Sequence, residues 1–294
     1  MNKIILCFFF TSFAFIFTAQ QKNSSKGFQY VLNQKMRSSF VLNDSMKHTN
    51  NPHNHSAFKI SLQKLKWKLF SFFGPRLISK ISFPKSTISF VKTKQKIVAF
   101  SIDDGFCRTN NKDGCMIDEI RKLFEKYDAK ATFFTTGSHC EFVERDKVDL
   151  LLSQGHELAN HNMFDQPYNK YSSEEFQLDL KKTDSILTTF SSCIPKLYRS
   201  PFGKFSKKMN QVLKLNNYIH VTCDVFANDV AIDDPQWISS HILKTVKPGS
   251  IILIHMPEIG FREWNFEAIK RTLEGLKGLN YDVVTVSALL KVNN

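Results

Sequence analysis

From Lys96 onward, short apolar segments alternate with segments of helical periodicity, and this alternation is the strongest constraint on the fold of the 294-residue chain. The strand-like segments are 97–102, 131–136, 157–160, 197–198, 218–223, 250–254 and 283–286. The helical segments between them are 116–127, 143–154, 173–190, 206–215, 235–246 and 262–279. Strand–helix units of this length place their strands in parallel in one sheet. We therefore predict an α/β fold, a distorted (β/α)7-type barrel.

Polar side chains follow these strands, at the ends that a parallel barrel gathers at one mouth. They are Asp103 and Asp104, then His161 with Asp165, then Arg199, then Asp229, then His255. A lone His or Asp at a strand end is most often structural, but packing does not explain five such ends in register. Two adjacent carboxylates after a buried strand also require positive partners. We therefore expect the chemistry of the chain at this mouth.

The net charge of +13 is concentrated ahead of the predicted barrel. Residues 22–96 carry 15 Lys and Arg against one acid, Asp44, whereas the 24 Lys and Arg from Ile97 on face 26 Asp and Glu. A near-neutral barrel argues against a nucleic-acid enzyme, so we expect no nucleic-acid partner.

The N-terminal residues have the pattern of a secretory signal. Lys3 precedes an apolar stretch from Ile4 to Phe17, which is short for a bilayer core of about 30 Å. We predict a signal peptide at 1–20 and a secreted protein of the cell wall or cell surface. Bulky Phe17 near the cleavage site leaves an uncleaved short anchor as the alternative.

A basic extension, 21–93, separates this signal from a catalytic domain at 94–294. Within it, apolar residues at helical spacing alternate with lysines: Leu62, Leu65, Leu69 and Phe72, with Lys64, Lys66 and Lys68. Two interpretations stay open: an amphipathic helix bound to an anionic membrane or wall surface, and a helix docked on the domain. Among six cysteines, Cys107 and Cys115 flank a short polar loop and are the best local disulfide pair.

The strand-end motifs, in this order, resemble those of the NodB-homology polysaccharide deacetylases (carbohydrate esterase family 4), which remove N-acetyl groups from chitin oligomers or peptidoglycan. The motifs are "SIDDG", "GHELANHNMFD", "YRSPFG", "CDVFANDV" and "ILIH", and the resemblance runs from about Lys96 to Val286. It implies a metal-dependent hydrolase that releases acetate from an N-acetylglucosamine polymer, chitin or peptidoglycan. We expect it to act as a monomer.

The resemblance also implies roles for single residues. Asp104 and His161 would bind one divalent metal ion, and Asp103 would be the general base that takes a proton from the attacking water. Arg199 would pair with Asp103 and keep it ionised and oriented. The backbone N–H of Phe202 would help to hold the oxyanion.

The leaving group and the acetyl group would meet the last two motifs. His255 would protonate the leaving amine, and Asp229 would hold the imidazole protonated. Leu253, two residues earlier, would line the pocket for the acetyl methyl group.

Phe202 stands in place of the family's Tyr, a mild change because its backbone has the role, and three further residues depart from the family's pattern. Asp165 stands where the family usually has its second metal-binding His, and Val230 and Cys223 replace tryptophans. An Asp-His-Asp set makes a divalent site formally neutral and favours Mn²⁺ or Co²⁺ over Zn²⁺. On this basis Asp165→His should raise zinc affinity and turnover. The alternative is that Asp165 caps the following loop while water fills the third position.

Two other functions compete with the deacetylase. A catalytically silent carbohydrate-binding homologue fits the three departures, but it does not need the acid and base that Asp103 and His255 provide. A metal-free amidohydrolase ranks last because Asp104 and His161 are present. Phe106, Phe164 and Trp264 could stack on sugar rings, although Trp264 could equally be core. We interpret His156 as structural and leave His139 without a role.

Overall fold

The computed structural model describes residues 57–72 and 74–292. The predicted signal at 1–20, and the part of the extension before Ala57, lie outside these residues. The described residues belong to one compact unit. Within the two described stretches, no helix is both long and apolar enough to cross a bilayer.

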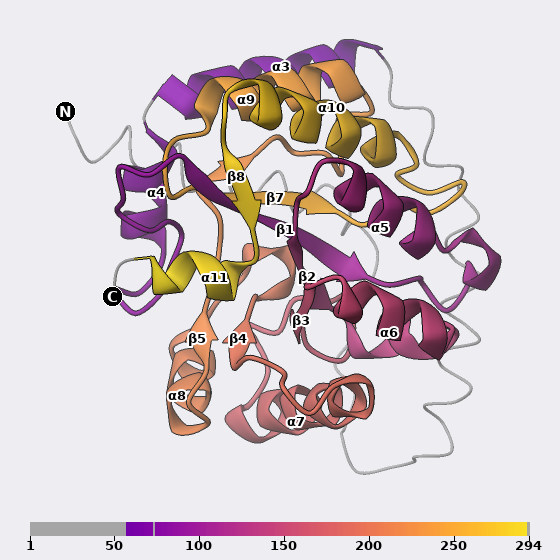
Figure 1. Ribbon diagram of the computed structural model, residues 1–294. Coiled ribbons are helices and arrows are strands. Elements are labelled where there is room, and N and C mark those ends of the chain that lie inside the picture. The colour runs from indigo at the N-terminus through magenta and orange to yellow at the C-terminus, as the bar shows by residue number, and fades with distance from the viewer. Residues whose placement is uncertain (1–56, 73, 293–294) are drawn as a thin grey trace. The chain divides into compact units, whose positions relative to one another are not determined.

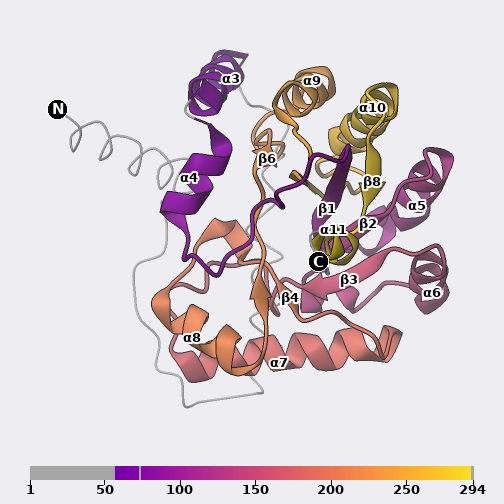
Figure 2. The same ribbon diagram turned by 60° about the vertical axis from the view of Figure 1, so that its left-hand side comes forward.

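The strands of the described chain form one parallel sheet that curls inside a ring of helices (Figure 1; Figure 2). They are β1 (Ile97–Gly105), β2 (Ala131–Thr135), β3 (Glu157–Asn160), β4 (Leu197–Tyr198), β5 (Ile219–His220), β6 (Val225–Phe226), β7 (Ile251–His255) and β8 (Asp282–Val284). Their order is β5-β4-β3-β2-β1-β7-β6, and β8 pairs with the start of β1. The predicted α/β barrel of the (β/α)7 type is confirmed.

The helices mostly cover the outside of the sheet, although the last of them packs Val286 and Leu289 against the inner residues Ala99 and Phe134. They are α3 (Ala57–Phe72), α4 (Pro75–Ser82), α5 (Ile117–Lys126), α6 (Arg145–Ser153), α7 (Ser173–Phe190), α8 (Lys207–Leu215), α9 (Pro235–Thr245), α10 (Trp264–Gly278) and α11 (Val286–Lys291). The longest of these, α7, begins with a capping box: Ser172 Oγ accepts from the Glu175 N–H at 3.1 Å, and a Glu175 carboxylate oxygen accepts from the Ser172 N–H at 2.9 Å.

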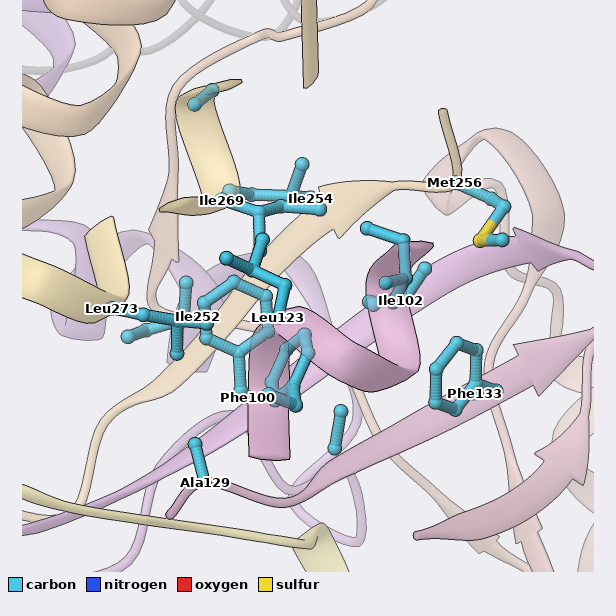
Figure 3. Packing of buried hydrophobic residues seen from close by; sticks show 14 of the residues in the cluster. Phe100, Ile102, Leu123, Ala129, Phe133, Ile252, Ile254, Met256, Ile269 and Leu273 are labelled. Atoms are coloured by element: carbon cyan, nitrogen blue, oxygen red, sulfur yellow. The ribbon is translucent and has the colours of Figure 1, made fainter. Parts of the chain in front are cut away.

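The main core lies between β1, β2 and β7 and the helices that cover them. Figure 3 shows Phe100 and Ile102 of β1 packed among Phe133, Ile252 and Ile254 of the neighbouring strands and the helix residues Leu123, Ile269 and Leu273. Alternate residues of these strands point outward to this core. The intervening residues of β1, Ser101 and Asp103, therefore point to the inside of the barrel.

Part of the extension contributes to the barrel. Residues 88–91 run between β5 and β7: the Thr222 N–H donates to Ile88 O at 2.8 Å, and the Val91 N–H donates to Gly249 O at 2.8 Å. Trp67 of α3 is buried against Phe226 of β6, with ring centroids 5.3 Å apart. One face of α3 thus docks on the domain through Trp67, but this is not the apolar stripe that the second interpretation expected to dock, because Leu62 and Leu65 of that stripe are exposed.

The structure differs from the predicted elements at two places. The strand expected at 218–223 ends at His220, and a separate β6 follows at Val225. Asp224, between them, accepts a hydrogen bond from the Ile251 N–H at 2.9 Å and so interrupts the regular pairing. The strand expected at 283–286 ends at Val284, because Thr285 caps α11 by accepting from the Ala288 N–H at 3.2 Å.

Candidate active site

A backbone irregularity brings Asp103 and Asp104 to the same mouth. Successive strand residues normally point to opposite faces. Here Asp104 has a left-handed φ of 62°, and the pairing register with β2 shifts between Asp103 and Gly105. His139, in the short helix Gly137–Cys140, donates from Nδ1 to the Asp104 carbonyl at 2.9 Å and supports this bulge. As a result both carboxylates approach the imidazole of His161.

Arg199 is the cation that accompanies Asp103. Its Nη1 lies 2.6 Å from Asp103 Oδ1 and donates to Ser101 Oγ at 2.8 Å, and its guanidinium stacks on the Phe134 ring at 4.0 Å. All three polar side chains are buried, so the pair is shielded from solvent competition. Val221 O and Thr222 O accept from the remaining nitrogens at 3.4 and 3.3 Å. Arg199 therefore fixes one Asp103 oxygen and leaves Oδ2 on the side of His161.

The tautomer of His161 makes Nε2 a ligand atom. Its Nδ1 lies 2.9 Å from the Arg199 carbonyl, which can only accept, so Nδ1 carries the proton. The Nε2 lone pair then faces Asp104 Oδ1 at 3.5 Å and Asp103 Oδ2 at 3.8 Å. Acceptors that face one another need a proton or a cation between them. A separation of 3.5 Å suits two donor atoms that each bind one ion at about 2.1 Å.

Asp165 lies near these groups but does not complete a closed metal cluster with them. In the part of the chain that the structure describes, no three His, Cys, Asp or Glu side chains converge as a metal site. Asp165 is exposed at the rim, yet desolvation by the surrounding walls and the charge of Asp104 raise its pKa to about 6. Asp104 and His161 thus fit a divalent ion, and the assignment of Asp165 as its third ligand stays a prediction.

Arg262 is the residue at this mouth that the sequence did not reveal. It precedes α10 in the loop after β7, and its Nη1 lies 2.6 Å from Asp104 Oδ2. Burial would raise the pKa of Asp104, but Arg262, and then His255 and His161, hold it well below its ordinary value. Burial would conversely lower the pKa of Arg262, and Asp104 and Asp165 together raise it.

His255 and Asp229 form a third ion pair of the mouth. His255 Nδ1 lies 3.1 Å from Asp229 Oδ1, and Asp229 Oδ2 accepts from the His255 N–H at 2.8 Å and from Asn265 Nδ2 at 2.6 Å. Burial would lower the pKa of His255, but the Asp229 charge outweighs it and raises that pKa. Trp264 Nε1 donates to the Asp229 carbonyl at 2.9 Å, so this ring positions Asp229.

The other predicted site residues lie on the same elements. Leu253 stands opposite Ser101, and His255 opposite Asp103, in the pairing of β7 with β1, so Leu253 faces the barrel interior two residues below His255. Phe202 lies in the short helix Pro201–Gly203 after β4 with a left-handed φ of 58°. Its role in holding the oxyanion stays a prediction.

Several smaller predictions are settled by burial and bonding. Phe106 is fully buried against Phe133, so the prediction that it stacks on a sugar was wrong. His156 is structural, as predicted: it is buried and accepts from the Ala131 N–H at 3.0 Å. The Cys107–Cys115 disulfide is confirmed, with the two Cα atoms 5.2 Å apart.

Comparison with known proteins identifies the domain that carries this mouth. Residues 90–221 match the polysaccharide deacetylase family. The chain carries a polysaccharide deacetylase domain. The matched range contains Asp103, Asp104, His161 and Arg199, and the fold and mouth described above continue it to β7 and α10.

Several relatives of this domain are peptidoglycan deacetylases by name. The peptidoglycan-N-acetylmuramic acid deacetylase PdaC of Bacillus subtilis is 26% identical over 212 residues, which cover 72% of this chain and 42% of PdaC. A peptidoglycan-N-acetylglucosamine deacetylase of Bacillus cereus is 29% identical over 205 residues, 68% of this chain and 91% of the relative. The chain therefore aligns with less than half of PdaC and with nearly all of the second protein.

Solved structures share the fold. The structure of PdaC from Bacillus subtilis superposes with a TM-score of 0.60 at 26% identity, over 69% of this chain and 94% of that chain. A CE4 family pseudoenzyme from Bacillus anthracis superposes with a TM-score of 0.61 at 20% identity, over 71% of this chain and 70% of that chain. The second likeness concerns the fold alone.

Proposed function

We propose that the chain is a secreted, metal-dependent deacetylase that hydrolyses the N-acetyl groups of an N-acetylglucosamine polymer and releases acetate. One observation carries the proposal: Asp103 and His255 lie opposite each other in the pairing of β1 with β7. The Asp103 carboxylate is bound by an arginine, and the His255 imidazole is bound by a second carboxylate. A base and an acid side by side are what amide hydrolysis requires. Because the relatives named above act on peptidoglycan, a peptidoglycan glycan is the preferred substrate, with chitin as the alternative.

Asp103 is the base of this mechanism. Arg199 holds Oδ1, so Oδ2 faces the centre of the mouth and accepts a proton as water attacks the acetyl carbonyl carbon. A divalent ion held by Asp104 and His161, with Asp165 as the third candidate ligand, would supply Lewis-acid polarisation of that carbonyl. The Phe202 N–H would stabilise the oxyanion, and Leu253 would contact the acetyl methyl group.

His255 is the acid. An amine leaves only when its nitrogen is protonated, so the C–N bond breaks as His255 transfers a proton to that nitrogen. Asp229 keeps the imidazole protonated through its charge and its bond to Nδ1, which leaves Nε2 to donate. The products are acetate and a free amine on the sugar.

The test is acetate release from peptidoglycan and from chitin oligomers, with metal content measured on the same protein. Asp103→Asn should lower kcat by about 10²–10⁴-fold, the usual contribution of a general base. The matched control, Asp282→Asn, makes the same change at an exposed residue of β8 and should retain activity. Equal activity of the two variants, or no acetate release by the native chain with any divalent ion, would refute the proposal.

A second candidate is a catalytically weak or inactive carbohydrate-binding homologue. It is favoured by one observation, the Arg262 guanidinium on Asp104 Oδ2, which takes one oxygen of a candidate metal ligand. Binding of chitin or peptidoglycan fragments without acetate release, in protein that is shown to be folded, would support it.

We further propose that the protein acts outside the cell as a monomer and that α3 contacts an anionic lipid surface. The disulfide supports an oxidising compartment. The outer face of α3 exposes an apolar stripe, Phe58, Leu62 and Leu65, and neighbouring exposed lysines Lys59, Lys66 and Lys68. An apolar stripe edged by lysines suits the boundary of an anionic bilayer.

A further inference from the structure

The Arg262 guanidinium is held at the mouth from several sides. Its side chain is 14% exposed, its φ of 53° is left-handed, and it lies over the Phe261 ring at 4.6 Å as well as on Asp104. The other cation on Phe261 is Arg108, at 3.3 Å. Arg262 is therefore seated between an aromatic ring and a carboxylate and is not a loose surface side chain.

The loop that carries Arg262 is fastened to the disulfide loop by a buried carboxylate. Glu258 accepts from Arg108 Nε at 3.2 Å and from Asn111 Nδ2 at 2.8 Å, and the Ile259 N–H donates to Gly114 O at 2.9 Å. Arg108 and Asn111 both lie in the loop that the Cys107–Cys115 disulfide closes. The position of Arg262 is thus built into the fold by contacts outside the mouth.

The position of Arg262 changes the net charge that the site would have with a metal ion bound. Asp104 and Asp165 contribute one negative charge each when ionised, and a histidine that binds a metal ion through Nε2 contributes none, with Nδ1 donating to the Arg199 carbonyl as it does here. A divalent ion bound by these three groups would form a neutral centre, which polarises a carbonyl weakly. With Arg262 on Asp104 and electrostatically coupled to Asp165, the loaded centre keeps a charge of +1.

We propose that Arg262 is a resident cation of the metal site, which offsets the charge of Asp165 and competes with the metal ion for Asp104. The inference rests on the proposed function, because it concerns the same ion. Arg262 lowers metal affinity and keeps the loaded site cationic. It also changes the expectation for Asp165: removing that carboxylate while Arg262 remains weakens metal binding, because two positive groups then share Asp104.

The experiment measures metal affinity rather than turnover. The full chain and its variants are titrated with Mn²⁺, Co²⁺ and Zn²⁺ by equilibrium dialysis with elemental analysis. Arg262→Gln should bind metal about tenfold more tightly or better, and Asp165→Asn about tenfold more weakly, since each change alters the charge near the ion by one unit. The double variant should return to within a few-fold of the native affinity.

Two further variants separate charge from folding. Arg262→Lys keeps the charge and should bind metal within a few-fold of the native protein. Arg271→Gln removes an exposed charge on α10 that pairs with Glu267 at 2.9 Å, and it should leave the affinity unchanged. Without metal, Arg262→Gln should melt at a lower temperature than Arg271→Gln, because Asp104 loses its partner, and added metal should raise its Tm more than that of the native chain.

The outcomes distinguish this inference from the proposed function. Metal affinity in Arg262→Gln no tighter than in Arg271→Gln would overturn the role of Arg262, even if the native chain releases acetate. The expected order of affinities in a chain that releases no acetate would sustain the inference and refute the deacetylase. Binding of no ion by any variant would overturn both.

Discussion

The mouth of the barrel depends on single residues whose backbone is unusual. Asp104, Phe202 and Arg262 have φ values of 62°, 58° and 53°, in the left-handed region that residues other than glycine rarely occupy. Asp104 lies in the last residues of β1, Phe202 in the short helix after β4, and Arg262 in the loop before α10. Such conformations persist where surrounding contacts over-determine them, as the His139–Asp104 and Arg262–Asp104 bonds do here.

The dependence of His255 on Asp229 leads to a prediction about pH. His255 acts as an acid, so activity falls as pH rises through its pKa, which Asp229 raises. Asp229→Asn removes that charge and lets burial dominate, so the alkaline limb of kcat/KM should move to lower pH by about one unit or more. A pH–rate profile measures this limb, and NMR titration of the His255 ring measures the same pKa independently of activity. An unmoved limb and an unchanged ring titration would contradict the assignment.

The sequence predicted most residues of the site but not Arg262. Strand-end position and motif order were enough for Asp103, Asp104, His161, Arg199, Asp229 and His255, because a parallel barrel gathers strand ends regardless of detail. Arg262 lies seven residues beyond His255, in a segment that we expected to be helical. Its path depends on the left-handed turn and on the Glu258 contacts with a distant loop, and neither leaves a local pattern in the sequence.

At the scale of elements, α4 is tied to the barrel by one arginine. Arg76 donates to Asp224 at 2.7 Å, to Pro248 O at 2.9 Å and to Ser250 Oγ at 3.2 Å. Asp224 is buried in the connection between β5 and β6, so its charge depends on this partner. Desolvation raises the pKa of Asp224 even with Arg76 present. Arg76 therefore joins this part of the extension to the barrel.

Arg76→Met should lower the free energy of unfolding by about 2–4 kcal/mol, because it leaves a buried carboxylate without its cation. Arg76→Met combined with Asp224→Asn should recover part of that loss. Urea denaturation of the two variants and of Lys85→Met, an exposed control beyond α4, measures the effect. If Arg76→Met is no less stable than Lys85→Met, the ion pair does not hold this element.

The two faces of α3 make a separate prediction. Trp67 and the Lys64–Asp234 pair, 2.6 Å apart, dock one face, while Phe58, Leu62 and Leu65 are 77%, 42% and 54% exposed on the other. The triple variant Phe58→Ser, Leu62→Ser, Leu65→Ser should lose most binding to vesicles that contain anionic phosphatidylglycerol, and binding should weaken with salt.

The control for α3 changes three exposed leucines elsewhere to serine: Leu150, Leu178 and Leu215. This variant should bind the same vesicles as the native chain does. Equal binding by both triple variants, or equal binding to neutral phosphatidylcholine vesicles, would place the lipid contact elsewhere or exclude it.

Periodicity predicted the long elements well and the short ones poorly. The helices expected from 116–279 appear within two residues of their expected bounds, because an apolar stripe over several turns identifies a helix. The two-residue strands β5 and β6 and the six-residue α11 have too few residues to show a period. Their limits depend on Asp224 and Thr285, side chains that bond to backbone groups and end the regular pattern.

For the molecule as a whole, two buried histidines link stability to pH. His156 and His220 are neutral in the folded chain: burial first, and then Lys130 for His156 and Arg199 for His220, lower their pKa values from 6.5 to about 4 and about 3. His220 is stacked on Phe205 at 3.9 Å and lies within hydrogen-bond distance of the Thr87 and Ser200 hydroxyls. Neither ring accepts a second proton without disturbing the core that surrounds it.

Between about pH 6.5 and these lowered pKa values the unfolded chain binds more protons than the folded one. The stability that the two neutral rings contribute is therefore complete above pH 6.5 and is lost as pH falls, at up to about 1.4 kcal/mol per pH unit for each ring. His220→Gln should flatten the dependence of the free energy of unfolding on pH between 6.5 and 4.5, and His156→Gln should do the same. Urea denaturation across this range measures the slope of the free energy of unfolding against pH. Subtracting the slope of the native chain removes the contributions of Asp104 and Asp165, which the variant and the native chain share.

His255→Gln is the opposing control for this prediction. Its ring has a raised pKa in the folded chain, so it contributes stability that is present at low pH and lost as pH rises. His255→Gln should therefore lower the free energy of unfolding mainly at acidic pH. The decrease in this free energy as pH rises above neutrality should become smaller. Slopes in His156→Gln and His220→Gln that match the native slope would show that both rings already take up protons in the folded barrel. Acid sensitivity would then have to arise from other groups, such as His241, whose pKa burial lowers to about 4, or Asp104.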